Sequence, residues 1–172
     1  MESLVVVGNG MAGIACLEQI LKHSPKFQVT VFGDETHVNY NRILLSSVLA
    51  GERAPEDITV NSLEWYQQND VGLRLGVRIV DVDTGRGNIT GDDGSVTPFD
   101  RLLIATGSSA FLPPISGLDK QNVFTFRNLD DTRAILSSAR PGAKAVNTAR
   151  TQARAKASHE AGLQCRVRSR RR

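Results

Sequence analysis

The sequence has little of what metal sites, disulfide frameworks and membrane spans require. Its 172 residues include two cysteines, Cys16 and Cys165, which lie far apart and form no C-x-x-C pair. A disulfide framework is therefore not expected, and this cysteine usage favours a reducing, cytoplasmic location. The three histidines share no metal-ligand spacing with each other or with the cysteines, so we expect no metal site. No run approaches the ~18 apolar residues that cross a bilayer, and no signal peptide is expected at the N-terminus.

Charge is distributed unevenly along the chain. Residues 1–146 carry 13 Lys and Arg against 17 Asp and Glu, a net −4, whereas residues 147–172 carry 8 against one acid, a net +7. The overall charge of +3 therefore comes from the last 26 residues. The body is mildly acidic and lacks the basic footprint of a nucleic-acid-binding domain. We expect neither nucleic acid nor a membrane among its partners.

What the sequence does contain is a glycine-rich turn near its start. An aliphatic run, Leu4–Val7, leads into Gly8-Asn9-Gly10-Met11-Ala12-Gly13, a G-x-G-x-x-G between a predicted strand and a predicted helix. Gly8 permits the tight turn, Gly10 lets a pyrophosphate approach the backbone, and Gly13 lets the helix pack close to the strand. The helix N-terminus offers N–H groups and the positive end of its dipole to phosphates. This turn predicts a bound dinucleotide.

An acidic pair follows the second predicted strand, at about 27–32. Asp34 and Glu35 come directly after Gly33, and Glu35 lies 22 residues past Gly13, close to the usual spacing of about 20. A carboxylate at this point accepts hydrogen bonds from the adenosine ribose hydroxyls. Either acid is well placed, and the sequence does not choose between them. A carboxylate here also argues against a 2′-phosphate, because the two negative charges would repel.

The pattern over residues 73–103 differs from that of a plain NAD dehydrogenase. Short alternating strands at about 78–83, 87–90 and 96–98, separated by glycines, predict a small antiparallel meander. The chain then returns to the parallel sheet through a strand at 101–105 that ends at Thr106-Gly107. An inserted meander of this kind is typical of the FAD-binding variant of the fold. The expected fold class is therefore α/β: a Rossmann-like FAD/NAD(P)-binding fold with a parallel sheet, flanking helices and a small antiparallel meander.

Further elements are expected outside this core. The helix over about 11–22 carries Cys16, which we expect to be a small core residue. Trp65 and Tyr66, in a short helix over 62–68, are expected to be packing residues. Another short helix is expected within 36–50, and a helix over 128–138 begins with acids, as the dipole prefers. Short strands are expected at 123–126 and from residue 143.

Four motifs together resemble the flavoproteins that have two dinucleotide-binding domains. They are Gly8–Gly13, Tyr40–Ser46, Leu102–Gly107 and Phe126–Asp131. Within that group, in the pyridine nucleotide-disulfide oxidoreductase superfamily, residues 3 to about 146 are most similar to the N-terminal FAD-binding part of the large subunit of assimilatory NAD(P)H-dependent nitrite reductase. The disulfide reductases carry a redox cysteine pair near residue 40, and its absence here excludes thioredoxin or glutathione reductase chemistry.

The resemblance implies a set of FAD-binding positions, and it implies no catalytic residue. One group would lie along the pyrophosphate: Gly8, Gly10, Met11, Ala12, Gly13, Ala105, Thr106 and Gly107. The others would meet the rest of the cofactor: Asp34 or Glu35 the ribose, Ile79 the adenine through its backbone, Arg42 the flavin side and Arg127 a phosphate. Ser47, which stands where ferredoxin reductases have a lysine, completes the expected cofactor-binding set.

In the intact family, the resemblance implies that electrons pass from NAD(P)H through FAD to iron–sulfur and siroheme segments of the same chain, with a small subunit, in nitrate assimilation. The second glycine fingerprint, which would bind NAD(P)H after the strand at 143–146, is missing from this sequence. We therefore expect residues 1–146 to be an incomplete FAD-binding domain that is weakly active or inactive alone. The alternatives are a ferredoxin or rubredoxin reductase-type flavoprotein, a simple NAD-binding dehydrogenase domain, and a non-enzymatic fragment.

The sequence changes character at Asn147, where a polar, arginine-rich segment begins. It has no evident apolar face, so we expect residues 147–172 to be a basic tail that is disordered or weakly helical. We interpret the change as translation in a shifted reading frame. This interpretation requires a glycine-rich second fingerprint in another frame of the nucleotide sequence beyond codon 146.

Overall fold

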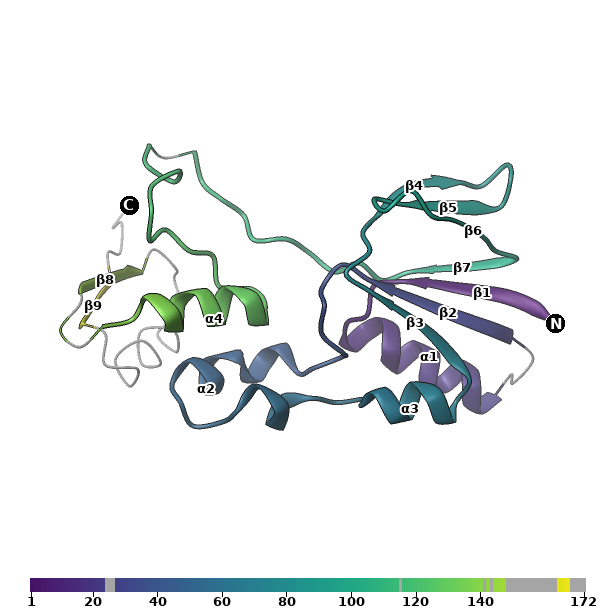
Figure 1. The fold of residues 1–172 in the computed structure, drawn as a ribbon, viewed down its shortest axis with the longest axis horizontal. Helices are drawn as coiled ribbons and strands as arrows, with labels where there is room; N and C mark the ends of the chain where they lie inside the picture. Colours follow the sequence, from purple (N-terminus) through teal and green to yellow (C-terminus); the bar gives the residue numbers. More distant parts are fainter. Residues whose placement is uncertain (24–26, 115, 141, 143, 148–163, 168–172) are drawn as a thin grey trace. The chain divides into compact units, whose positions relative to one another are not determined.

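The computed structural model describes residues 1–23, 27–114, 116–140, 142, 144–147 and 164–167 (Figure 1). The chain divides into two compact units. The first unit contains Met1–Tyr40 and Thr59–Ser108, and the second contains Asn41–Ile58 and Ser109–Arg172. The predicted domain boundary at residue 146 stays a prediction, because most of the segment beyond it lies outside the described residues.

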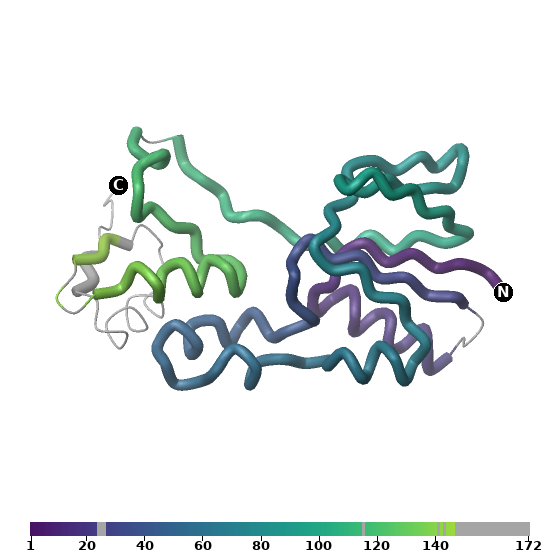
Figure 2. The backbone as a smooth tube through the Cα atoms, in the orientation of Figure 1, coloured from purple at the N-terminus to yellow at the C-terminus, as the bar shows by residue number. Residues whose placement is uncertain are grey.

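A four-stranded parallel sheet forms the centre of the first unit. Its order is β3-β2-β1-β7, built from β1 (Glu2–Val7), β2 (Phe27–Gly33), β3 (Val71–Leu75) and β7 (Arg101–Ile104). β1 lies between β2 and β7, and Figure 2 shows it beside β7 although the two are far apart in the sequence. Because β1 is covered on both faces, Leu4–Val7 is a continuous buried apolar run and not an alternating one. The predicted Rossmann-like class is confirmed.

Two different layers cover the faces of this sheet. On one face, α1 (Met11–His23) and α3 (Leu63–Gln68) bury a core cluster that includes Leu4, Val6 and Ile14 (Figure 1). On the other face lies the antiparallel sheet of β4 (Ile79–Asp83), β5 (Asn88–Gly91) and β6 (Val96–Pro98). Val5 and Val7 point to this second side, where they pack in a cluster with Ile89. The predicted meander is therefore confirmed.

The second unit is built mainly from short helices. It contains η1 (Arg42–Leu44), α2 (Leu45–Leu49), η2 (Pro55–Ile58) and α4 (Leu129–Ser138), and α2 packs against α4. The side chain of Asn128 caps α4 by accepting a hydrogen bond from the Asp131 N–H at 2.7 Å. A parallel pair, β8 (Lys144–Asn147) and β9 (Gln164–Val167), completes the described part of this unit.

Two expectations about local structure were wrong, and one strand was not predicted. Residues 123–126 form no strand, and the Thr125 hydroxyl instead donates to Asp131 at 2.7 Å. Cys16 is exposed, because it lies two positions after Ile14 and therefore points away from the buried stripe of α1. β3 was not among the predicted strands, since Gly72 and Arg74 interrupt its apolar pattern at the edge of the sheet.

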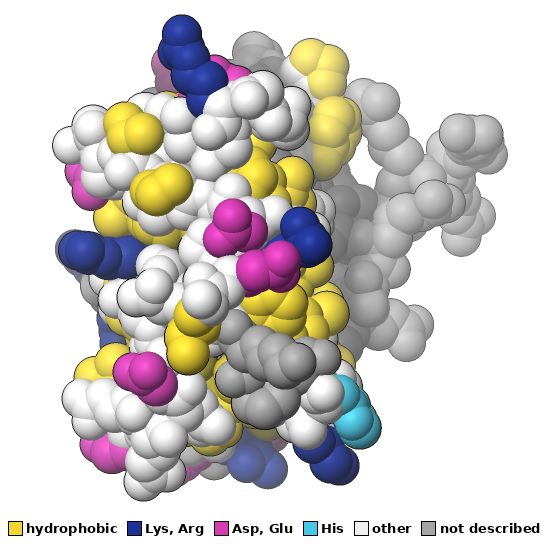
Figure 3. Space-filling model, turned by 90° about the vertical axis from the view of Figure 1, so that its right-hand side faces the viewer, with side chains coloured by type: hydrophobic (Ala, Val, Ile, Leu, Met, Phe, Trp, Pro, Cys, Tyr) yellow, Lys and Arg dark blue, Asp and Glu magenta, His cyan; other side chains and the backbone are white. Residues whose placement is uncertain are grey.

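The basic tail is only partly described. Asn147 and residues 164–167 lie in β8 and β9, which differs from the expected disordered or helical state at those positions. Residues 148–163 and 168–172 lie outside the described residues. Among the residues that the structure describes, no helix is long and apolar enough to cross a membrane. On the face shown in Figure 3, the described basic side chains are scattered among acidic and apolar ones.

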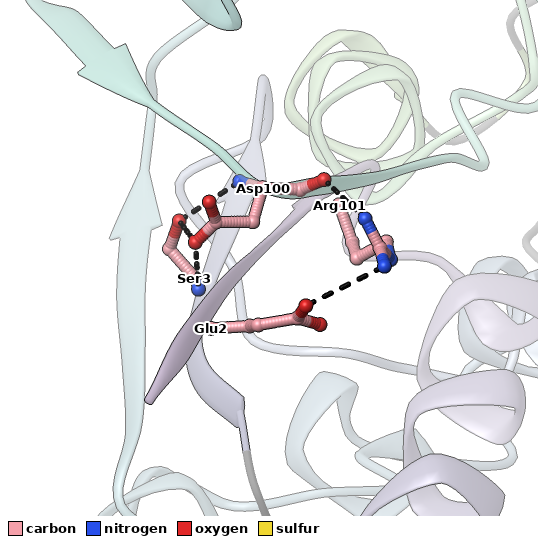
Figure 4. A network of polar contacts seen from close by, with 4 residues as sticks. All are labelled: Glu2, Ser3, Asp100 and Arg101. Carbon is pink, nitrogen blue, oxygen red and sulfur yellow. Dashed lines mark hydrogen bonds and ion pairs between the residues drawn. The ribbon is translucent and has the colours of Figure 1, made fainter.

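A polar network joins the first residues of β1 to Arg101, the first residue of β7, and to Asp100 just before it (Figure 4). The Asp100 carboxylate accepts hydrogen bonds from the Ser3 N–H at 2.7 Å and from the Ser3 hydroxyl at 2.9 Å. The Asp100 N–H donates to the Ser3 hydroxyl at 2.9 Å. Arg101 Nη2 lies 3.4 Å from Glu2 Oε1 in an exposed ion pair. The bonds from the Ser3 backbone and side chain hold the pKa of Asp100 below its usual value.

Replacing the carboxylate should weaken this end of the sheet in a pH-dependent way. We expect Asp100→Asn to lower the thermal unfolding midpoint at pH 7 by a few degrees. The Asp100 pKa is lower in the folded state, so its contribution is present above the unfolded pKa of about 3.9 and is lost as pH falls through the folded pKa. Circular dichroism melts from pH 7 to pH 3 measure this, with exposed Asp119→Asn as the control. A difference between wild type and variant that does not shrink in acid would contradict the assignment.

Candidate functional site

The residues that follow β1, β2, β3 and β7 meet at one edge of the parallel sheet. The Gly8 N–H donates to the Phe32 carbonyl at 2.8 Å, and the Ala105 N–H donates to the Val7 carbonyl at 2.8 Å. The carbonyls of Gly33 and Glu35 accept hydrogen bonds from the residues that follow β3, at 3.0 and 3.1 Å. The carboxyl ends of parallel strands lie at the same edge, which is where open α/β sheets bind ligands.

The three glycines of the first turn have different surroundings. Gly8 has φ +114°, and a Cβ there would lie 2.2 Å from the Ala105 carbonyl oxygen. A Cβ at Gly13 would lie 2.6 Å from the Gly8 carbonyl oxygen. At Gly10, by contrast, a Cβ would meet nothing within 4 Å. Gly8 and Gly13 are therefore required by packing, whereas the backbone at Gly10 is open to approach.

Exposed backbone surrounds this open position. Met11 and Ala12 begin α1 and are exposed, and the first intrahelical bond runs from the Ile14 N–H to the Gly10 carbonyl at 3.1 Å. The N–H groups before it have no acceptor within the helix. Thr106 and Gly107 are exposed beyond β7, and Gly107 has φ +72°. The structure thus brings together the expected diphosphate positions Gly8–Gly13 and Ala105–Gly107.

The two acids after β2 have distinct roles in the structure. Asp34 is exposed, and its carboxylate lies 3.3 Å from Arg78 Nη2 in an ion pair between exposed side chains. Glu35 is half-buried, and its carboxylate accepts a hydrogen bond of 2.6 Å from the hydroxyl of buried Tyr40. Tyr40 belongs to the motif Tyr40–Ser46, but the sequence analysis assigned it no role. The structure shows that it holds the Glu35 carboxylate. Ile79 is the first residue of β4, and its side chain packs against the cluster that contains Val5.

Arg42, Ser47 and Arg127 belong to the second unit. There Arg42 Nη1 donates to the Arg127 carbonyl at 3.2 Å, and the Arg127 N–H donates to Asp131 at 2.6 Å. Ser47 lies half-buried on α2. The structure therefore brings the two arginines together within this unit, and their predicted cofactor contacts stay predictions.

Sequence reasoning missed the polar side chain inside the glycine turn. Asn9 Oδ1 accepts a hydrogen bond of 2.7 Å from the Tyr66 hydroxyl, which was expected only to pack. A polar residue between two glycines was the one sign in the sequence that Asn9 makes a specific contact. Its partner could not be identified, because Tyr66 lies 57 residues away. Within the described part of the chain, no group of three or more His, Cys, Asp and Glu side chains could hold a metal ion.

Comparison with known proteins places this geometry in a family. Residues 2–156 match the family model for pyridine nucleotide-disulphide oxidoreductases. The assimilatory nitrate reductase electron transfer subunit of Bacillus subtilis is 43% identical over 146 residues, which are 84% of this chain and 19% of that protein. The nitrite reductase (NAD(P)H) of the same organism is also 43% identical over 146 residues, 84% of this chain and 18% of that protein. The chain thus spans about a fifth of the length of these curated relatives.

A solved structure shares the fold. The crystal structure of the covalent putidaredoxin reductase–putidaredoxin complex superimposes with a TM-score of 0.87 over 96% of this chain and 42% of the matched one. At 22% identity, this likeness concerns the fold alone. The family match, in contrast, spans most of the sequence. The chain therefore belongs to the pyridine nucleotide-disulphide oxidoreductase family.

Proposed function

We propose that this chain is the FAD-binding portion of an NAD(P)H-dependent oxidoreductase of the assimilatory nitrite reductase type. The observation that carries the proposal is the open backbone at Gly10, between tightly packed Gly8 and Gly13. The names of the two Bacillus subtilis relatives support the nitrite reductase class. We also propose a cytoplasmic location, because the two cysteines form no pairing pattern.

The residues present fit the ADP half of FAD. The diphosphate would lie against the backbone of Gly10–Gly13 and beside Ala105–Gly107, where no side chain would obstruct it at Gly10. The N-terminal end of α1 favours negative charge there, through both its N–H groups and its dipole. The backbone of Ile79 would meet the adenine. Arg42, Ser47 and Arg127 are proposed, on family resemblance, for the remainder of the cofactor.

Of the two acids, we assign the ribose to Asp34. It is the first residue after β2 and is exposed, so a ligand arriving from solvent can reach its carboxylate. Its ion pair with Arg78 joins exposed side chains, and such pairs contribute only about 0–1 kcal/mol, so it can rearrange. Glu35 is instead held by the buried Tyr40 hydroxyl, which makes it a support for the turn.

This chain's share of the reaction is positioning and electrostatics. When bound, the flavin would supply the redox chemistry: it accepts two electrons as a hydride from NAD(P)H, releases the proton and passes the electrons on one at a time. The residues of the first unit would bind and orient the cofactor, and none is needed as an acid, base or nucleophile. In the whole protein, we propose that electrons pass onward to iron–sulfur and siroheme segments and that a small subunit takes part.

Filling the open position should remove cofactor binding without unfolding the chain. We expect Gly10→Val to weaken FAD binding at least about 10-fold, because the new side chain occupies the space that the diphosphate needs. The cost in stability should stay on the order of 1 kcal/mol, because valine ranks below glycine at a helix N-cap and the space around Gly10 is open. Flavin absorbance during titration of the purified chain and urea unfolding measure the two effects.

Gly13→Val is the matched contrast, since a side chain there meets the Gly8 carbonyl. Overpacking of this kind costs about 1–3 kcal/mol, so this variant should lose stability as well as binding. Wild-type FAD affinity in folded Gly10→Val would refute the proposed cradle.

Substituting each of the two acids in turn should distinguish the role of Asp34 from that of Glu35. We expect Asp34→Asn to weaken FAD binding about 10-fold, because a neutral amide accepts weaker hydrogen bonds from ribose hydroxyls than a carboxylate does. Glu35→Gln keeps an acceptor for Tyr40 and should change FAD affinity less than threefold, roughly half a kcal/mol. Isothermal titration with FAD and with AMP measures both variants. A larger loss in Glu35→Gln than in Asp34→Asn would reverse the assignment.

A further inference from the structure

The glycine turn carries one side chain that reaches into the body of the first unit. Asn9 lies between Gly8 and Gly10, and its two polar atoms contact different segments. Its Oδ1 accepts from the Tyr66 hydroxyl at 2.7 Å, and its Nδ2 donates to the His37 carbonyl at 3.4 Å. A Cβ at Gly33 would lie 2.9 Å from the Asn9 Cβ, so Asn9 also packs closely against the end of β2. Asn9 therefore connects the glycine turn to Tyr66 on α3 and to the segment that follows β2.

The partner of Asn9 is fixed by the core. Tyr66 is 1% exposed, and it packs in the apolar cluster that contains Leu4, Ile14 and Leu17. The ring of Trp65 meets it edge-on, with ring centroids 5.0 Å apart. Burial raises the pKa of Tyr66 to about 12. The protonated hydroxyl donates a hydrogen bond to Asn9 Oδ1. A buried hydroxyl of this kind costs free energy when it has no partner.

A second set of hydrogen bonds joins the neighbouring segments of the first unit. Buried Asn39 donates to Asn61 at 2.8 Å, and Asn61 donates to Glu18 on α1 at 2.9 Å. The backbone of Asn39 lies near the Tyr66 hydroxyl and acts to lower its pKa, against the larger effect of burial. The segments after β2, before α3 and along α1 are thus joined by side chains within the first unit. Tyr66, buried in the core cluster, is the more constrained partner of the pair, because glycine backbone in the turn has unusual conformational freedom.

We propose that the hydrogen bond between Asn9 and Tyr66 sets the binding-competent shape of the glycine turn, so that both are positioning residues for the diphosphate of an adenine dinucleotide. This inference rests on the proposed function. Neither residue needs to touch the ligand. Their contribution is preorganisation: without the bond, the turn must be ordered when the ligand binds, and part of the affinity is lost. Asn9 cannot be exchanged for an apolar residue without leaving the Tyr66 hydroxyl one partner short.

The test is a double-mutant cycle on the full chain, with ADP as the probe. We expect Asn9→Ala and Tyr66→Phe each to weaken ADP binding about 3- to 10-fold, the worth of one hydrogen bond. Because both remove the same bond, the double variant should bind no more weakly than Asn9→Ala. Amide hydrogen exchange of residues 8–11 should rise in all three variants.

Val71→Ala is the matched control, because Val71 belongs to the same core cluster as Tyr66. It should lower the urea unfolding midpoint while leaving ADP affinity and exchange of the turn unchanged, so general destabilisation is separated from positioning. If Tyr66→Phe does not fold, ADP affinity and hydrogen exchange of the turn are compared between Asn9→Ala, which changes a half-buried residue, and Val71→Ala. Only Asn9→Ala should then show weaker ADP binding.

Two results would overturn the inference alone: ADP affinity unchanged in the folded variants, or losses that multiply in the double variant. A wild-type chain that binds neither ADP nor FAD would instead overturn the proposed function, and the inference with it. The two failures are therefore distinguishable.

Discussion

The backbone of Gly8 passes so close to Ala105 that a Cβ at Gly8 would lie 2.2 Å from the Ala105 carbonyl oxygen. This close approach brings the end of β1 against the end of β7 and turns the chain into α1. Gly13 then allows α1 to cross over the same point, with a Cβ there lying 2.6 Å from the Gly8 carbonyl. Gly10 is left at the open edge of the sheet. The candidate site thus follows from a packing constraint. Gly8 and Gly13 are needed where the chain is crowded, and the backbone of Gly10 between them is left accessible.

Buried polar side chains hold the segments around that edge. Apolar clusters pack on the two faces of the sheet. The loops at the strand ends are joined to this core by pairs such as Tyr40 with Glu35 and Tyr66 with Asn9, in which the hydroxyl of a buried tyrosine donates to a loop residue. Each pair joins a buried aromatic ring to a residue in a loop at the end of a strand. The loops that would meet a ligand are therefore ordered by the core beneath them.

Sequence patterns predicted the parts of the fold that depend on local periodicity. The strand–turn–helix around Gly8–Gly13 and the antiparallel meander have strong local signals, and both are present. β3 was missed because an edge strand is buried on fewer sides, so Gly72 and Arg74 are tolerated within it. The choice between Asp34 and Glu35 could not be made from the sequence, because it depends on which carboxylate is engaged by a buried group. Arg78, the partner of Asp34, lies 44 residues away, and nothing in the local pattern showed that nearby Tyr40 is buried and donates to Glu35. The same holds for Arg42 and Arg127, which are 85 residues apart in the sequence.

The most direct test of the central claim is a crystal structure of the chain grown with FAD. The account predicts diphosphate oxygens about 3 Å from main-chain N–H groups of Gly10–Gly13, which is hydrogen-bonding distance. It also predicts that the adenosine ribose lies at Asp34 and that the Asn9–Tyr66 hydrogen bond is retained. A diphosphate bound elsewhere on the chain, with the glycine turn left uncontacted, would contradict it.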